Sequence, residues 1–269
     1  VGLQCGIMDQ FASMMGKENQ LVLLNCGNRS FEYVPIDTGN YELLLLNTGV
    51  SHNLAESAYN QRREECATGL ALLQQHLPNA KSLSDISSAQ VEAFAQNLPK
   101  AVYQRCWHVT TENERVRAAI EAIQQNNLAQ LGALLFASHY SLRDDYVVSC
   151  EELDFLVEQA QKHPGVIGAR MMGGGFGGCT INLVHRNKLD AFTEQTAKAY
   201  DKRFSIDLKA YPVHISDGAK MTAYEYHNFI LQPHEQSTPT LQYTYRRMGT
   251  RFTTSKQTPL AREDRNSSS

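Results

Sequence analysis

The most specific chemical feature of the sequence is a glycine-rich run between Met172 and Cys179, which reads Gly-Gly-Gly-Phe-Gly-Gly. Five glycines in six positions indicate that the backbone approaches another group too closely for side chains, either a phosphate or a neighbouring loop. The run also satisfies the G-x-G-x-x-G dinucleotide pattern, but that fingerprint must open a helix, and a strand-like segment follows here. A phosphate-contacting loop and a purely structural hairpin therefore stay open as interpretations.

Two further side chains could take part in chemistry, and each also has a plain structural interpretation. Asp9 lies in the first turn of a predicted helix, where free backbone N–H groups and the helix dipole stabilise a carboxylate. Such an acid could act as the base for a substrate hydroxyl, or it could be an ordinary helix-start acid. The phenol of Tyr59 could bond a sugar hydroxyl while its ring packs on the sugar, or the ring could simply fill space.

The remaining charged and metal-binding residue types carry weaker signals. Residues 62–65, which read Arg-Arg-Glu-Glu, are typical of a solvated helix face. No spacing among His52, His108 and His139 predicts a metal cluster, so we interpret them as surface or core residues. The six cysteines contain no CxxC pair, which argues against a zinc site and favours reduced thiols in a cytoplasmic protein.

The elements that must position these residues form a mixed α+β pattern. Apolar residues recur at helical spacing from 7 to 16 and through much of 54–162, and Ser149 with Glu152 predicts a capping box. The run 41–48 is nearly all apolar, as expected of a strand that is covered on both faces. Further strands are predicted at 20–25, 30–36, 166–171, 179–184 and 210–216, with a helix at 188–204.

Composition limits the classes of partner. The net charge of −3 at pH 7 provides no basic field, so nucleic-acid binding has little support. No stretch approaches the roughly eighteen apolar residues that are needed to cross a bilayer, so no membrane partner is expected.

Several segments, taken together and in order, resemble the galactokinases of the GHMP small-molecule kinase superfamily. The segments are VGLQCGIMDQF at the start, SAYNQRREEC around Tyr59 and ARMMGGGFGGC at the glycine run, with HVTTENERV and SHYSLRDDYVVSCEELD between them. The resemblance covers residues 1–219. It implies an α+β fold, the two-layer sheet-and-helix C-terminal domain of a GHMP kinase. The ATP-binding N-terminal half is expected upstream of Val1.

The resemblance also implies roles for individual residues. Asp9 matches the catalytic base that takes the proton of the anomeric hydroxyl of α-galactose. Gly6 matches a backbone contact to the sugar, and Tyr59 matches a tyrosine that bonds a ring hydroxyl. Gly174 and Gly175 match the loop beside the transferred phosphate. The implied reaction converts ATP and galactose to galactose 1-phosphate.

The cofactors that the resemblance implies are ATP and Mg²⁺, and their main binding residues are expected in the missing upstream segment. No metal ligand is therefore assigned within this chain, and the fragment alone is expected to be an inactive monomer. Two positions depart from the family pattern: Ala58 stands where Glu is common, and Met172 stands where Thr is usual beside the glycine loop. The second departure removes a hydroxyl that could bond near the phosphate, so it bears on turnover or nucleotide affinity.

Three functional classes stay open at this point. The first is a galactose kinase, and the second is a galactokinase-like sensor that binds sugar and nucleotide to regulate a partner protein. The third is a kinase of the same superfamily that acts on another sugar. The retained Asp9 favours an enzyme over a sensor.

Residues 220–269 match no part of the resemblance. They contain many Thr, Gln and Pro residues and too little periodic apolar surface to offset the entropy of ordering. We therefore predict a folded part at 1–219 and a poorly ordered tail.

Limited proteolysis tests this prediction. Proteases should cleave the tail first and leave a resistant core that ends near Lys220, which mass spectrometry would locate. Protection of the tail, with first cleavage inside 54–162, would show that the tail packs on the rest of the chain.

Overall fold

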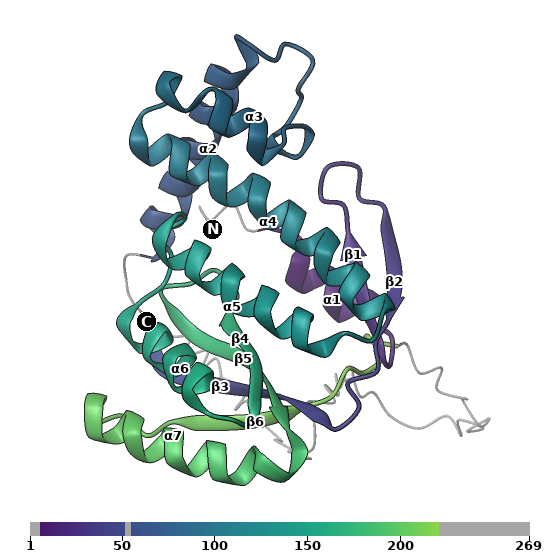
Figure 1. Ribbon diagram of the computed structural model, residues 1–269, viewed down its shortest axis with the longest axis vertical. Coiled ribbons are helices and arrows are strands. Elements are labelled where there is room, and N and C mark those ends of the chain that lie inside the picture. Colours follow the sequence, from purple (N-terminus) through teal and green to yellow (C-terminus); the bar gives the residue numbers. More distant parts are fainter. Residues whose placement is uncertain (1–5, 52–54, 221–269) are drawn as a thin grey trace, which may run out of the picture. The chain divides into compact units, whose positions relative to one another are not determined.

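The computed structural model describes residues 6–51 and 55–220, and the proposed tail beyond residue 220 lies outside them. Figure 1 shows how the described helices and strands are arranged. Their order follows the sequence predictions closely. The helices are α1 (Met8–Met15), α2 (Ala55–Gln74), α3 (Ser88–Ala93), α4 (Lys100–Gln124), α5 (Leu128–Asp144), α6 (Glu151–Lys162) and α7 (Leu189–Phe204). The strands are β1 (Gln20–Leu24), β2 (Phe31–Pro35), β3 (Tyr41–Ser51), β4 (Val166–Met172), β5 (Gly177–His185) and β6 (Lys209–Val213).

The strands form a two-stranded hairpin and a four-stranded antiparallel sheet. In the larger sheet the order is β4-β5-β3-β6, so β3 lies inside and is hydrogen-bonded along both edges. Leu44, for example, is paired with Asn182 of β5 on one side and with Pro212 of β6 on the other. The hairpin of β1 and β2 is separate.

Both faces of the larger sheet carry packed apolar residues. Leu44 and Leu46 are fully buried in a core that includes residues of α6 and α7, among them Val157 and Phe192. The opposite face presents Leu183 and Leu43 to the end of α4, the start of α5 and the hairpin. The expectation that 41–48 is covered on both faces is confirmed. The mixed α+β class is confirmed as well, and the structure adds a second helical layer to the sheet-and-helix pair that was expected.

A second, entirely helical core lies away from the sheet. It joins α2, α3 and the first half of α4 through buried residues that include Leu73, Val91 and Val102. This packing fixes the long helix α4, which then runs beside α5 toward the sheet (Figure 1). None of the described helices combines the length and the apolar character needed to cross a membrane.

The predicted capping box at Ser149 is wrong. Helix α6 begins at Glu151 with Cys150 as its N-cap, so Ser149 lies one residue too early. The Ser149 hydroxyl instead donates to Asp154 Oδ1 at 2.5 Å. The same carboxylate oxygen lies 3.2 Å from His139 Nε2, which draws Asp154 toward α5.

Helix α5 approaches strand β4 closely because two glycines meet there. A Cβ atom at Gly132 would lie 2.0 Å from the carbonyl oxygen of Ile167, and a Cβ at Gly168 would lie 2.4 Å from Gly132 Cα. Both obstacles are backbone atoms, so no side chain can move aside to make room.

Gly132→Ala should therefore destabilise the protein. The better helix propensity of alanine is worth about 1 kcal/mol, whereas overpacking costs about 1–3 kcal/mol or more, so the clash should win. The midpoint of urea unfolding measures the change. Gly174→Ala is the control, because a Cβ at Gly174 would meet no atom within 4 Å. An unchanged midpoint in Gly132→Ala would contradict the close contact.

Candidate functional site

One end of the sheet brings together the start of α2 and the glycine-rich loop. Strand β3 pairs with β5 as far as Ser51↔Gly177, and α2 begins four residues after Ser51. A register shift between Asn47 and Ser51, with Gly49 at a φ of +73°, bends β3 before it leaves the sheet. The loop between β4 and β5 comes directly before Gly177 in the chain. Tyr59, in the first turns of α2, comes shortly after its partner Ser51.

The glycine loop has an exposed tip and an anchored half. Met172, Gly173 and Gly174 are exposed, and a Cβ at either glycine would meet no atom within 4 Å. Gly175 is anchored, because a Cβ there would lie 2.1 Å from the carbonyl oxygen of Val148. The next residue, Phe176, donates its backbone N–H to that oxygen at 2.8 Å and has a φ of +59°.

The two sequence interpretations concern different parts of the run. At Gly175 the close neighbour is a protein loop, since the glycine is required by the Val148 carbonyl. At 173–174 the backbone is open, with a φ of +88° at Gly173, and a phosphate could approach it. The hairpin is therefore structural at its base and accessible at its tip.

The interpretation of 62–65 as a solvated helix face is wrong for two of the four residues. Arg62 is only 8% exposed, and it forms an ion pair with Glu65. The same carboxylate accepts a hydrogen bond of 2.7 Å from Arg105 Nε. The physical reason is that α4 packs against this face of α2 and supplies Arg105 from 40 residues away. Burial would raise the pKa of Glu65, but the hydrogen bonds and charges of Arg62 and Arg105 outweigh it and hold the pKa below its usual value.

A second group of polar residues supports the strand that leads into the glycine loop. Arg170 of β4 pairs with Glu112 of α4 at 3.2 Å, and Glu112 also binds Arg115 and the hydroxyl of Ser138. Burial opposes ionisation of Glu112, but the hydrogen bonds from Ser138 and Arg115 and the nearby arginines lower its pKa. On the same strand, the backbone N–H of Met171 donates to His139 Nδ1 at 3.3 Å.

The predicted base Asp9 lies in the first turn of α1 and is exposed. Helix α1 is held mainly from its C-terminal end, where Tyr33 Oη donates to the Met15 carbonyl at 2.8 Å and Ala219 N donates to the Ser13 carbonyl at 2.8 Å. Gly218 N also donates to the Gly16 carbonyl at 2.7 Å. Gly6 precedes the helix, and a Cβ there would meet no atom within 4 Å.

The structure therefore groups the predicted residues only in part. Tyr59 and the glycine loop share one end of the sheet, whereas Asp9 and Gly6 belong to α1, which is anchored to the hairpin and to residues 216–219. No hydrogen bond or ion pair joins these two sets among the residues described. Sequence reasoning missed Arg105 and Glu112. In the sequence, each of the two is only a charged residue in a predicted helix that also contains apolar residues, so nothing marked them as contacts of the site.

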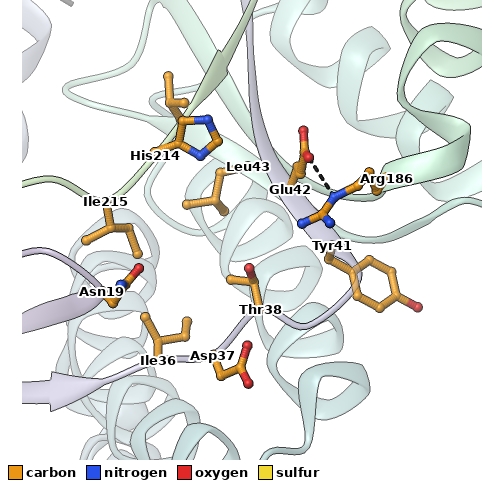
Figure 2. A pocket seen from close by; sticks show the side chains of 11 residues that line it. Asn19, Ile36, Asp37, Thr38, Tyr41, Glu42, Leu43, Arg186, His214 and Ile215 are labelled. Carbon is orange, nitrogen blue, oxygen red and sulfur yellow. Dashed lines mark hydrogen bonds and ion pairs between the residues drawn. The ribbon is translucent and has the colours of Figure 1, made fainter.

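A pocket among the described residues lies elsewhere. It has a volume of about 390 Å³ and is found at the start of β3, the end opposite Ser51. Figure 2 shows the ion pair of Glu42 with Arg186 on one side of it and Asn19, Ile36 and Asp37 on the other. It contains none of the predicted site residues. The guanidinium of Arg186, which lines it, already forms an ion pair with Glu42, with Nε 2.8 Å from Oε1. We therefore place the candidate site at the glycine-loop end.

Comparisons with known proteins identify relatives of this chain. The family model described as GHMP kinases C terminal matches residues 119–202, which include the glycine loop. Galactokinases of Clostridium perfringens and Enterococcus faecalis are 41% and 42% identical over 219 and 221 residues. These matches cover 81% and 82% of this chain but 56% and 57% of the relatives, so the chain spans a little over half their length.

A solved structure supports the same relationship. The crystal structure of Lactococcus lactis galactokinase complexed with galactose matches with a TM-score of 0.77 and 37% identity. The match covers 81% of this chain and 56% of that chain.

The buried His108 makes a pH dependence testable. Burial lowers the pKa of His108 to about 4, and its Nδ1 lies 2.9 Å from the hydroxyl of Ser141. Because the folded pKa lies below the unfolded value near 6.5, the unfolded state binds the extra proton, and stability should fall as pH drops from about 6.5 toward 4. For this histidine the loss between pH 7 and pH 5 should be about 2 kcal/mol.

Urea unfolding of His108→Asn and wild type at both pH values measures this contribution. The pH-dependent loss should be smaller in the variant by about that amount, since the carboxylates with lowered pKa are common to both proteins. His76→Asn, at an exposed histidine, is the control. Equal losses in wild type and His108→Asn would contradict a buried neutral His108.

Proposed function

Because this chain is a galactokinase homologue that carries the C-terminal domain of the GHMP kinases, we propose that it acts in the ATP-dependent phosphorylation of galactose at the anomeric hydroxyl. The reaction converts galactose and ATP to galactose 1-phosphate and ADP. The observation that carries this proposal is the exposed glycine tip, which lies within the residues that match the GHMP family model. The galactose bound to the Lactococcus lactis relative supports the choice of sugar.

In the proposed reaction Asp9 is the base. Its carboxylate takes the proton of the anomeric hydroxyl while the sugar oxygen forms a bond to the γ-phosphorus. The bond from that phosphorus to the β,γ-bridging oxygen breaks, and its electron pair leaves with ADP. The exposed position of Asp9 on a short helix that is anchored at its other end supports this assignment.

The other predicted residues position the two substrates. The open backbone at Gly6 and the hydroxyl of Tyr59 contact the sugar, and the backbone at Gly174 and Gly175 lies beside the transferred phosphate. Met172, exposed at the edge of the tip, offers a thioether where a hydroxyl would donate a hydrogen bond. We therefore assign phosphate contacts to backbone N–H groups of the loop.

The described residues do not by themselves form a site for the Mg²⁺ of the kinase family. Within 6–51 and 55–220, no group of three or more His, Cys, Asp or Glu side chains is arranged to hold a metal ion. We therefore assign no step to a metal held by these residues.

The proposal can be tested by extending the full 269-residue chain with the N-terminal portion of Lactococcus lactis galactokinase that it does not match. The extended chain should phosphorylate galactose, and Asp9→Asn should lower kcat by about 10²- to 10⁴-fold, the usual effect of a positioned proton acceptor. Tyr59→Phe should mainly raise the KM for galactose, by about 2- to 10-fold, since it removes one hydrogen bond. Formation of the sugar phosphate is measured.

The comparisons among these proteins separate the alternatives. Wild-type kcat in Asp9→Asn would remove Asp9 from the mechanism. Binding of galactose and ATP without turnover would favour a sensor over an enzyme. The unextended chain serves as the control, and turnover by it alone would show that it contains an ATP site other than the one proposed.

A further inference from the structure

We propose that Arg105 is a positioning residue that ties the sugar-contacting helix α2 to the phosphate-contacting glycine loop. The two elements lie more than 100 residues apart in the sequence. Arg105 belongs to neither of them, is 6% exposed, and hydrogen-bonds to groups on the path to each. The inference rests on the proposed function for what the two elements bind, but the coupling itself rests on the contacts alone.

The contact to α2 passes through Glu65. Arg105 Nε donates to Glu65 Oε2 at 2.7 Å, and Arg62 donates to the same oxygen. Gln61 Nε2 donates to the other carboxylate oxygen at 3.0 Å. Three donors thus fix one carboxylate, and two of them belong to the helix turn that follows Tyr59. The hydrogen bond from Arg105 of α4 to Glu65 therefore fixes the orientation of that turn.

The contact to the glycine loop passes through the segment that follows α5. Arg105 Nη1 donates to the backbone carbonyl of Asp145, which caps the C-terminus of α5. The chain then turns at Val147, with a φ of +55°, and Val148 N donates to the Leu142 carbonyl at 3.1 Å. The Val148 carbonyl in turn accepts from Phe176 N at 2.8 Å. Only two residues, Tyr146 and Val147, therefore lie between the residue whose carbonyl Arg105 holds and the residue whose carbonyl anchors the loop.

Tyr146 fills the space between the two contacts. Its hydroxyl lies 3.8 Å from Cys66 Sγ of α2, and its ring centroid lies 4.6 Å from that of His108. Burial raises the pKa of Tyr146, so the phenol stays neutral there. Tyr146 lies between Asp145 and Val148 in the chain and also contacts α2. A displacement of residues 145–148 would therefore also displace the part of α2 around Cys66.

The chemistry explains why an arginine is needed. Its guanidinium donates from two different nitrogens in fixed directions, here to a carboxylate on α2 and to a carbonyl after α5. A lysine keeps the charge, but its single ammonium cannot reproduce the fixed fork geometry. Arg105→Lys should therefore loosen the link without removing the buried charge.

Hydrogen exchange on the full 269-residue chain tests the coupling. In Arg105→Lys, the Phe176 amide and the amides of 58–66 should both exchange about tenfold faster, which corresponds to the loss of one charged hydrogen bond. Amides of 41–48 in β3 should be unchanged. Arg143→Lys is the matched control, because Arg143 lies two residues from Asp145 and forms a more exposed pair with Asp144.

Each result decides for or against the proposal. Faster exchange in both regions, with β3 and the control unchanged, supports it. Faster exchange in only one region, or in neither, overturns it, and so does an equal increase throughout the chain, which would indicate a general structural role. If Arg105→Lys does not fold, Glu65→Gln is judged by the same criteria, since it keeps the side-chain shape and loses the charge.

A kinetic readout in the extended chain adds the functional consequence. Arg105→Lys should both raise the KM for galactose and lower kcat, each by about tenfold, whereas Tyr59→Phe should act mainly on KM. Unchanged KM and kcat in Arg105→Lys would overturn the positioning role. An extended chain without kinase activity would refute the proposed function instead, and the exchange result would still decide whether Arg105 couples the two elements.

Discussion

The rest of the structure depends on the pairing of β3 along both of its edges. This strand is hydrogen-bonded to β5 on one side and to β6 on the other, and its buried leucines anchor the core beneath α6 and α7. Its far end leads to α2 and pairs with the first residue after the glycine loop. A shift of one residue in its register would exchange the residues that face its two cores and would change the pairing that places α2 and the loop.

Interactions outside the sheet complete what β3 begins. The glycine loop rests on the carbonyl of Val148, and the strand before it is held by Arg170 and by the backbone contact to His139. On the other side, α1 is closed against the last described residues by hydrogen bonds from Gly218 and Ala219. The two parts of the candidate site are therefore supported by different sets of contacts.

Buried charge is concentrated close to the candidate site. The buried Arg62 and Arg105 are paired with Glu65, and the half-buried Arg170 is paired with Glu112, although apolar side chains at these places would cost less desolvation. Such pairs contribute little net stability compared with apolar packing, but removing one partner leaves a buried charge without compensation. Their value to this protein is geometric, because hydrogen bonds of fixed direction define where α2 and the glycine loop lie.

The sequence by itself determined the elements, their order and the similarity to the galactokinases. Helical and strand periodicities are local properties of the chain, so the strands at 20–25, 41–48 and 166–171 could be predicted within a few residues. The glycine run also predicted an unusual backbone conformation, because glycine adopts positive φ angles far more readily than other residues do.

Only the tertiary structure decided which polar residues are buried and what each glycine approaches. Arg62 and Glu65 have the spacing of a solvated face, but Arg62 is buried and Glu65 is half-buried because α4 supplies Arg105 from 40 residues away. A Cβ at Gly175 would lie 2.1 Å from the Val148 carbonyl oxygen, while a Cβ at Gly174 would meet no atom within 4 Å, although the sequence makes the two glycines equivalent. Such contacts join segments that are distant in the chain. The local sequence pattern of one segment does not indicate which distant segment will pack against it.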